Sequence, residues 1–259
     1  MPDDPESSAE RDGSTTATTH FGFLTVAEEE KASLVGAVFD SVANRYDLMN
    51  DLMSGGVHRL WKAAMIDWLR PRPEMRLVDV GGGTGDIAFR FRDAGGGPVT
   101  VIDVNQEMLR VGRDRAIDSG RLAGIQWLCG DAESLPLADS SVDAYTTAFC
   151  LRNVTRLDQA LAEARRVLKP GGRFLCLEFS RVILPVLDRL YGSYSFNVLP
   201  TLGRLVANDR EAYSYLAESI RRFPGQEAMA RRITAAGLDR VRWANLSGGI
   251  AALHSAWRT

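Results

Sequence analysis

The chain has 259 residues, of which only three are cysteine and three are histidine. Cys129, Cys150 and Cys176 lie far apart, each in or beside an apolar run that predicts a core strand. We expect them to be small buried side chains, because such spacing does not form a disulfide framework. The histidines also lack the spacing of metal ligands. The sequence therefore predicts no metal site.

Long apolar runs and an excess of basic residues are also missing. No run approaches the ~18 residues that a membrane-spanning helix needs. The net charge is -2, and acids interrupt the arginine-rich stretches, so we expect solvated helix faces and no nucleic-acid partner. Residues 1–19 are rich in Ser, Thr, Asp and Glu, unlike a secretory signal or a mitochondrial presequence. We expect them to form a disordered tail of a cytoplasmic protein.

The remaining sequence predicts one large α/β domain with helical additions. Hydrophobic residues make up 45% of the chain, which is enough for a large core. Residues 20–72 are expected to form a helical cap, with helical sequence from Thr25 that breaks near Gly55 before a second helix, Val57–Leu69. Residues 73–259 are expected to form the main domain, with a helical insertion at 181–224.

The most informative stretch is a glycine-rich loop between an apolar run and a helical segment. Its candidate binding residues are Asp79, Gly81, Gly83, Thr84 and Gly85. A second apolar run then ends in an acid, Asp103, 18 residues after the last of these glycines. Strand, glycine loop, helix and second strand with a terminal acid are typical of a nucleotide site in a doubly wound fold, where the acid meets ribose hydroxyls.

Two ligands fit the glycine loop. Residues 83–88 match the G-x-G-x-x-A form of the dinucleotide fingerprint, so an NAD-dependent oxidoreductase is one alternative. However, Asp79 and Asp86 bracket the loop, and a pyrophosphate requires positive potential there. S-adenosylmethionine carries no phosphate but has a sulfonium and an ammonium, which carboxylates stabilise. The charges therefore favour the methyl donor.

Later segments extend this pattern to a sheet. Strands are predicted at residues 125–129, 142–149 and 173–179, and Asp131 and Ala132 follow the first of them, where a carboxylate and a backbone N–H can bind adenine. Helices are predicted at 208–223 and 226–236, and two strand-like runs, 241–246 and 251–257, predict an antiparallel edge. The fold class is therefore α/β, with a mostly parallel sheet and helices on both faces. Residues 181–206 are either a helix pair packed on the core or a lid over a channel for a long apolar tail.

Short motifs between Thr19 and Ile220 resemble one known family, and the resemblance covers about His20 to Trp257. They are Thr19–Phe23, Tyr46-Asp47, Met49–Asp51, His58–Lys62, Gly82–Asp86, Leu151–Val154, Arg166–Gly172, Leu177–Ser180 and Tyr215–Ile220. Together they resemble the ubiquinone/menaquinone biosynthesis C-methyltransferases of the UbiE family. The glycine loop alone indicates a methyltransferase. The N-terminal motifs and Leu151–Val154 indicate a methyltransferase of this particular family.

The resemblance implies a Rossmann-like class I methyltransferase fold with a seven-stranded sheet. It implies S-adenosyl-L-methionine as the cofactor, with S-adenosyl-L-homocysteine as the product, and a ring carbon of a polyprenylated benzoquinol or naphthoquinol as the methyl acceptor. In this family Thr84, Asp103 and the Asp131-Ala132 pair correspond to donor contacts, and we add Val104 beside Asp103.

Carbon methylation of a quinol needs a group that favours the phenolate, because an unperturbed phenol has a pKa of about 10. Arg152 follows the fourth predicted strand and is our candidate for stabilising the phenolate or positioning a water, the alternative being an exposed arginine near a helix start. Asn153 either orients the same water or caps the helix that begins near Leu157. His58 is the nearby residue with a suitable pKa for a base, or else a packed surface residue.

Polyprenyl quinols reside in the bilayer, whereas no segment of this chain spans one. We therefore expect transient contact with a membrane surface and a cytoplasmic enzyme that is peripheral on the inner face of the membrane. The sequence leaves open a homodimer, a quinone-biosynthesis complex, and a role as a donor-binding scaffold subunit without its own turnover.

Overall fold

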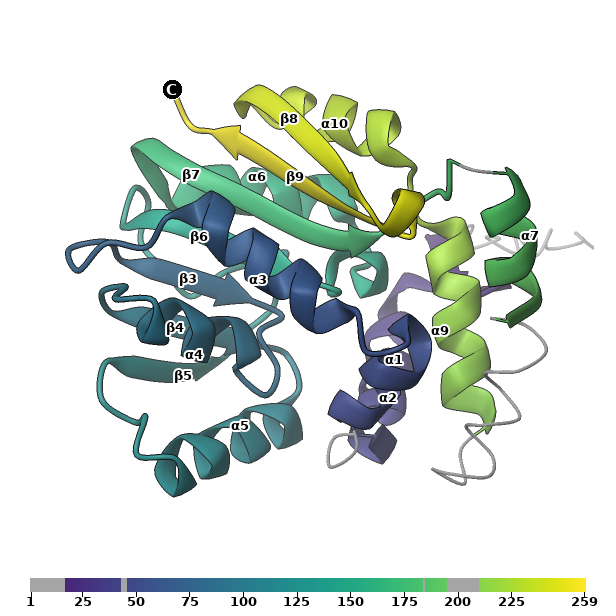
Figure 1. The fold of residues 1–259 in the computed structure, drawn as a ribbon, viewed down its shortest axis with the longest axis horizontal. Coiled ribbons are helices and arrows are strands. Elements are labelled where there is room, and N and C mark those ends of the chain that lie inside the picture. Colours follow the sequence, from purple (N-terminus) through teal and green to yellow (C-terminus); the bar gives the residue numbers. More distant parts are fainter. Residues whose placement is uncertain (1–16, 43–45, 184, 195–209) are drawn as a thin grey trace, which may run out of the picture.

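A seven-stranded sheet forms the centre of the molecule (Figure 1). The computed structural model describes residues 17–42, 46–183, 185–194 and 210–259. The strands are β3 (Leu77–Val80), β4 (Val99–Asp103), β5 (Ile125–Cys129), β6 (Val142–Ala148), β7 (Leu168–Phe179), β8 (Asp239–Leu246) and β9 (Ala251–Trp257), in the spatial order β5-β4-β3-β6-β7-β9-β8. β9 runs antiparallel to both of its neighbours, and the other pairs are parallel. The predicted mostly parallel sheet with an antiparallel edge is confirmed.

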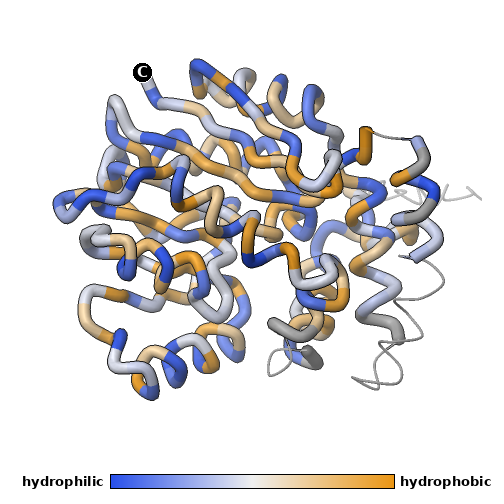
Figure 2. Tube along the Cα trace, viewed as in Figure 1, coloured by the Kyte–Doolittle hydropathy of each residue, from blue (hydrophilic) through white to orange (hydrophobic). Residues whose placement is uncertain are grey.

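Helices cover both faces of this sheet. One face carries α3 (His58–Leu69), α4 (Asp86–Asp93) and α5 (Gln106–Asp118), and the other carries α6 (Leu157–Val167) and α10 (Gln226–Ala235). Side chains alternate along each strand, so Leu175 and Leu177 of β7 pack on the first face and Phe174 and Cys176 on the second. Figure 2 shows the hydrophobic residues concentrated along the central strands.

The N-terminal segment differs from the sequence prediction. Residues Thr18–Phe21 (β1) and Leu24–Ala27 (β2) form an antiparallel hairpin, and α1 (Glu28–Val42) begins only after it. The prediction of a helix from Thr25 and of a tail through residue 19 is therefore wrong at these positions; residues 1–16 lie outside the described part. Gly22 turns the hairpin at a φ of 58°, and the ring of Phe21 stacks on Tyr215 with centroids 4.2 Å apart. The hairpin is thus stabilised by a contact distant in sequence.

A helical layer lies beyond the carboxyl ends of the central strands. It contains α1, α2 (Tyr46–Ser54), α7 (Pro185–Ser193) and α9 (Arg210–Arg222) (Figure 1). The hydroxyl of Tyr194 donates a hydrogen bond to the carbonyl of Leu52 at 2.6 Å, which ties the segment after α7 to α2. Residues 184 and 195–209 of the predicted lid lie outside the described residues. The division into cap, core and lid stays a prediction.

Two expectations from the composition can now be compared with the structure. Cys176 is buried as predicted, but Cys129 is exposed, because it lies at the last position of β5, the edge strand of the sheet. The prediction that all three cysteines are buried is therefore wrong. None of the described helices is long and apolar enough to cross a membrane.

Candidate functional site

The carboxyl ends of β3, β4, β5 and β6 meet in a cleft, which we call the glycine-loop cleft. It is lined by Ala32, Val35, Val80, Gly81, Asp103, Val104, Gly130, Asp131, Ala132, Glu133, Cys150, Asn153, Val154 and Thr155. Ligands of open α/β sheets bind at this edge, because the loops leaving parallel strands converge there. Six of these residues were predicted from the sequence: Gly81, Asp103, Val104, Asp131, Ala132 and Asn153.

The glycine loop connects β3 to α4 in a conformation that side chains would obstruct. Gly81, Gly83 and Gly85 all have positive φ, of 64°, 51° and 82°. A Cβ on Gly81 would lie 2.2 Å from the sulfur of Cys150, and one on Gly85 would lie 2.5 Å from the ring of Trp127. The loop therefore needs glycine both for its backbone and for its close packing. Thr84 is buried within the loop and does not line the cleft.

Asp103, the last residue of β4, is held by the loop. Its Oδ2 accepts a hydrogen bond from the N–H of Gly83, and its Oδ1 accepts one from the N–H of Asn105, both at 2.9 Å. Burial raises the pKa of this carboxyl to about 6, although the backbone N–H groups lower it. The oriented carboxylate suits the hydroxyl or ammonium donors of a ligand in the cleft.

Asp79 lies beneath the loop rather than in the cleft. Its side chain is 1% exposed, and its Oδ1 accepts a hydrogen bond from the hydroxyl of Thr146 at 2.8 Å. Among the described residues its Oδ2 has no hydrogen-bond partner. Burial raises the pKa of this carboxyl to about 7. Asp79 therefore lies under the loop without touching the cleft, and it adds negative potential there once its carboxyl ionises near pH 7.

The sequence predicts that adenine binds at Asp131 and Ala132. In the structure Asp131 is exposed and Ala132 is buried. Oδ1 of Asp131 accepts a hydrogen bond from the N–H of Glu133 at 2.9 Å, which turns the chain at Ala132. Glu133 Oε1 in turn accepts from the N–H groups of Thr155 and Arg156, both at 2.8 Å. These bonds fix the wall of the cleft between β5 and α6.

The cleft is small in this structure because α1 closes over it. Its volume is about 80 Å³, below the ~300 Å³ of typical ligand pockets. Ala32 and Val35 of α1 line it, and Nζ of Lys31 donates a hydrogen bond to the carbonyl of Val154 at 2.7 Å. Helix α1 therefore forms one wall of the cleft and limits its volume.

The charges around the loop fit a cationic ligand. Lys62 is the cation near the loop, and its Nζ already bonds Oδ2 of Asp86 at 2.8 Å. Burial alone would raise the pKa of Asp86, but Lys62 and Arg90 hold it below its usual value. Among the described residues Asp79 and Asp103 form no ion pair, although the charge of Lys62 lowers the pKa of Asp79 against the larger effect of burial. The cleft can thus accept a sulfonium and an ammonium, whereas a pyrophosphate would meet these carboxylates.

A second cavity adjoins the cleft, and we call it the Tyr215 cavity. Its volume is about 510 Å³, and it shares Val154 and Thr155 with the glycine-loop cleft. The hairpin, α1 and α9 form its walls, and Tyr215 and Arg152 lie in its lining. Burial raises the pKa of the Tyr215 hydroxyl. The cavity offers space for a second reactant beside the ligand of the cleft.

Arg152 follows β6 in the short 3₁₀ turn Leu151–Asn153, and its side chain is buried. Its Nη1 donates hydrogen bonds to Oε1 of Glu178 at 2.9 Å and to the carbonyl of Phe149 at 2.5 Å. The alternative of an exposed arginine is therefore wrong. Burial raises the pKa of Glu178, although the charge of Arg152 opposes this. The carboxylate and the Phe149 carbonyl together fix the guanidinium.

Asn153 lines the glycine-loop cleft, and its Oδ1 accepts a hydrogen bond from the hydroxyl of Tyr215 at 2.9 Å. The alternative that it caps a helix is wrong, because α6 begins at Leu157 with Arg156 as its N-cap residue. The N–H groups before this helix bind Glu133 instead. Asn153 thus connects the cleft to the Tyr215 cavity.

His58 lies outside both spaces. It is 2% exposed, its Nε2 lies 2.9 Å from Oδ1 of Asp51, and burial lowers its pKa. It lines a cavity of about 420 Å³ between α3, α4 and α5. A role for His58 as a base stays a prediction, and the structure places the residue away from the other candidates.

Sequence reasoning missed several residues of the site. Cys150 and Glu133 follow predicted strands, so their position in the chain was a usable signal. Glu178 and Tyr215 lay inside family motifs but had no assigned role, because their partners Arg152 and Asn153 are distant in sequence. Within the described ranges, no group of three or more His, Cys, Asp or Glu side chains could hold a metal ion.

Comparisons with known proteins show which family and which solved structures the chain resembles. Residues 24–258 match the ubiE/COQ5 methyltransferase family. A relative from Paracoccus denitrificans, named ubiquinone/menaquinone biosynthesis C-methyltransferase UbiE, is 61% identical over 241 residues, which are 93% of this chain and 96% of the relative. One of the same name from Brucella abortus is 55% identical over 242 residues, 92% of this chain and 90% of the relative.

Solved structures of lower identity share the fold. A SAM-dependent methyltransferase of Thermotoga maritima has 21% identity and a TM-score of 0.63, with 86% of this chain and 99% of that chain covered. The [4+2]-cyclase SpnF has 20% identity and a TM-score of 0.64, with 86% and 94% covered. Because the second protein is named for a different reaction, the fold alone does not define the chemistry.

Proposed function

Because the chain belongs to the ubiE/COQ5 methyltransferase family, we propose that it methylates a ring carbon of a polyprenylated benzoquinol or naphthoquinol in ubiquinone or menaquinone biosynthesis. The observation that carries this proposal is that the glycine-loop cleft and the Tyr215 cavity adjoin at Val154 and Thr155, which line both. One space suits the donor and the other the acceptor ring, so the two reactants can meet at this junction.

The cofactor is S-adenosyl-L-methionine, which supplies an electrophilic methyl group when bound and leaves as S-adenosyl-L-homocysteine. We assign its ribose hydroxyls to Asp103 and its adenine to Asp131 and Ala132. Gly81, Gly83, Thr84 and Gly85 let the backbone approach closely, and Val104 packs beside Asp103. Asp79 acts through negative potential beneath the loop.

The acceptor must lose a hydroxyl proton before its ring carbon is nucleophilic, because an ordinary phenol has a pKa of about 10. Arg152 stays charged at any working pH, so it cannot readily accept this proton. We assign it hydrogen-bond donation to the developing phenolate, in an orientation that Glu178 fixes. Asn153, held by Tyr215, orients the hydroxyl or a water beside it. We assign His58 no step in this mechanism, because it lines another cavity.

The Tyr215 cavity also supports the choice of acceptor. Phe223 and Leu157 contribute apolar surface to a lining that is mostly polar and charged, so the cavity has room for a ring with hydroxyls rather than for the apolar tail. The polyprenyl tail requires contact with a membrane surface, which we propose to be transient and peripheral on the cytoplasmic face, through the segment 181–224. A homodimer or a quinone-biosynthesis complex is compatible with this arrangement.

Turnover with labelled S-adenosylmethionine on benzoquinol and naphthoquinol substrates tests the proposal. Methylation of at least one of them supports it, whereas donor binding without turnover on either favours the scaffold subunit. Isothermal titration with S-adenosylhomocysteine and with NADH tests the oxidoreductase, for which the carboxylates around the loop are unsuited. Tight binding of NADH in place of S-adenosylhomocysteine would contradict the donor assignment.

A further inference from the structure

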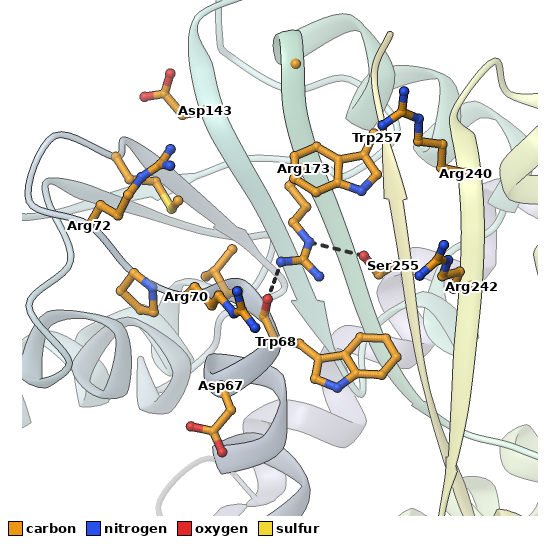
Figure 3. Close-up of a pocket in the computed structure, with 14 residues that line it drawn as sticks. Asp67, Trp68, Arg70, Arg72, Asp143, Arg173, Arg240, Arg242, Ser255 and Trp257 are labelled. Carbon is orange, nitrogen blue, oxygen red and sulfur yellow. Dashed lines mark hydrogen bonds between the residues drawn. The ribbon is translucent and has the colours of Figure 1, made fainter.

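A large cavity lies at the opposite end of the sheet from the glycine-loop cleft (Figure 3). Its volume is about 970 Å³, and it lies where the end of α3 faces the first residues of β7 and β8 and the last residue of β9. Five arginines line it: Arg70, Arg72, Arg173, Arg240 and Arg242. We call it the arginine cavity. Its arginines come from three distant parts of the chain.

The pairing of the edge strands gathers these side chains on one face. Arg173 of β7 lies opposite Trp257 of β9, and Arg242 of β8 lies opposite Ser255 of β9. Directly paired residues share a face of a sheet, and so do residues two apart in a strand. Trp257 and Ser255 are two apart, so all four side chains lie on the same face, beside the end of α3.

Two of the arginines occupy backbone conformations that favour glycine. Arg70 ends α3 with a φ of 53°, and Arg240 has a φ of 52°. The register between β8 and β9 shifts between Asp239 and Arg242, so Arg240 lies in a bulge of the edge strand. Bulges redirect side chains, and left-handed positions occur where the surrounding structure requires them. Both distortions coincide with a guanidinium that lines the cavity.

Positive charge in the cavity is not balanced by the carboxylates around it. Arg72 pairs with the exposed Glu74 at 3.1 Å, but the other four arginines form no ion pair with the described residues. Asp143, which also lines the cavity, is bonded through Oδ1 to Nζ of Lys169 at 2.7 Å. Asp67 is the other acid in the lining. Two carboxylates therefore face five guanidinium groups, and the cavity keeps an excess of positive charge.

Arg173 is fixed in the centre of this arrangement. Its Nε donates a hydrogen bond to Oγ of Ser255 at 3.2 Å, and its Nη1 donates one to the carbonyl of Trp68. Its guanidinium carbon lies 5.1 Å from the centroid of the Trp257 ring. In Figure 3 the guanidinium lies between those of Arg70 and Arg242. Burial lowers the pKa of Arg173, and the charge of Arg70 lowers it further.

We propose that the arginine cavity binds a phosphate ester. Guanidinium groups bind phosphate through two parallel N–H donors, and the indoles of Trp68 and Trp257 provide flat apolar surfaces for the body of the ligand. The volume is that of a small-molecule site. The phosphate can belong to a free small molecule or to the head group of an anionic phospholipid. This inference does not depend on the proposed methyl transfer, because no residue of the arginine cavity lines the glycine-loop cleft or the Tyr215 cavity.

The test uses the full chain and two probes. Inorganic pyrophosphate is titrated calorimetrically, and vesicles of phosphatidylcholine, with and without one part in three of phosphatidylglycerol, are tested by flotation. The variant is Arg240→Gln with Arg242→Gln, two exposed side chains of β8. Its affinity is expected to fall at least about tenfold. The control is Arg113→Gln with Arg231→Gln, which removes the same charge from exposed positions on α5 and α10. Its affinity should stay within about twofold of the wild-type value.

The outcomes separate the two sources of phosphate. Pyrophosphate binding that the variant loses assigns a free phosphate ester, and binding only to phosphatidylglycerol vesicles, lost in the same variant, assigns a lipid head group. An equal loss in the control, or no binding of either probe to the wild-type protein, overturns the proposal. Arg173→Lys keeps the charge but removes the planar pair of donors, so its affinity should also fall. Unchanged affinity would overturn the assignment of Arg173 as a phosphate ligand.

Discussion

The glycine-loop cleft and the arginine cavity lie at opposite ends of one sheet and carry opposite charge. Asp103, Asp131 and Glu133 line the cleft at the carboxyl ends of the strands, and Asp79 lies beneath it. Five arginines line the cavity at the other end. The net charge of -2 conceals this separation. A cationic donor is attracted to one end and an anion to the other, so the two sites can be occupied independently.

The two regions also differ in how the chain builds them. In the cleft, the candidate residues lie at or shortly after the ends of β3, β4, β5 and β6, so the strand order brings them together. In the arginine cavity, the pairing of β7, β9 and β8 brings Arg173 close to Arg240 and Arg242, 67 and 69 positions later, and the end of α3 adds Arg70 from 103 positions earlier. A short motif can encode the first kind of site, whereas the second exists only in the folded sheet.

The largest expected effect tests whether the chemistry belongs to the carboxyl end. Arg152→Ala removes the donor to the developing phenolate, so turnover should fall about a hundredfold or more while donor affinity stays within a few fold. The loss should shrink as the pH approaches the pKa of the quinol, because solvent then removes the proton. Initial rates with labelled donor across pH, together with titration of S-adenosylhomocysteine, measure both quantities.

Folding must be monitored for this variant, because it leaves the buried Glu178 without its partner. Glu178→Gln is the companion variant, since it keeps the shape of the pair and should reduce turnover less. Arg113→Ala, at an exposed position of α5, is the control. A defect of the same size at every pH would point to positioning of the acceptor rather than to stabilisation of the phenolate.

The next effect tests the acidic character of the cleft. Asp103→Ala should weaken donor binding by about 1.5–3 kcal/mol, roughly ten- to a hundredfold, and urea unfolding measures the stability lost with the hydrogen bonds from Gly83 and Asn105. The pKa of Asp103 is about 6, so wild-type affinity should also decline as the pH falls through that value and the carboxylate is protonated. The variant should lack this decline. Calorimetry between pH 5 and pH 8 checks both, and unaltered affinity in the folded variant would remove Asp103 from the site.

A third effect concerns the acid beneath the loop. The pKa of Asp79 is raised to about 7 from an ordinary 3.8, so its contribution to stability is fully present below pH 4 and is lost as the pH rises through 7. Between pH 5 and pH 8 the free energy of unfolding of Asp79→Asn should therefore rise by about 2 kcal/mol relative to that of the wild-type protein. Urea unfolding of both proteins at these two values measures the gain. Parallel stability curves would show that Asp79 does not titrate in this range.

The smallest effect sharpens the contrast between the two ends. Arg240→Gln with Arg242→Gln changes only the arginine cavity, so turnover on a soluble short-chain quinol should stay within about twofold of the wild-type value. The same labelled-donor assay measures it. A loss comparable to that of Arg152→Ala would mean that the two ends are not independent.

Most of the site residues that sequence reasoning found lie at or near a strand end. The glycine loop, Asp103 and Asp131 follow from local turn requirements and from the strand pattern. The burial of Arg152 could not be predicted, because it depends on Glu178, 26 residues away. The hairpin Thr18–Ala27 was missed because its Phe21 packs on Tyr215 of α9. Cys129 was misjudged because the exposed edge position of β5 depends on strand order.

The sequence by itself determined the alternation of strands and helices, the glycine loop and the acids at strand ends, and so the fold class and the donor site. These features depend on periodicity and on backbone conformations that neighbouring residues specify. Only the tertiary structure decided the burial of Arg152, the closure of α1 over the cleft and the assembly of the arginine cavity. Each of these needs contacts between segments far apart in the chain, and their pairing is fixed by the packing of the whole sheet.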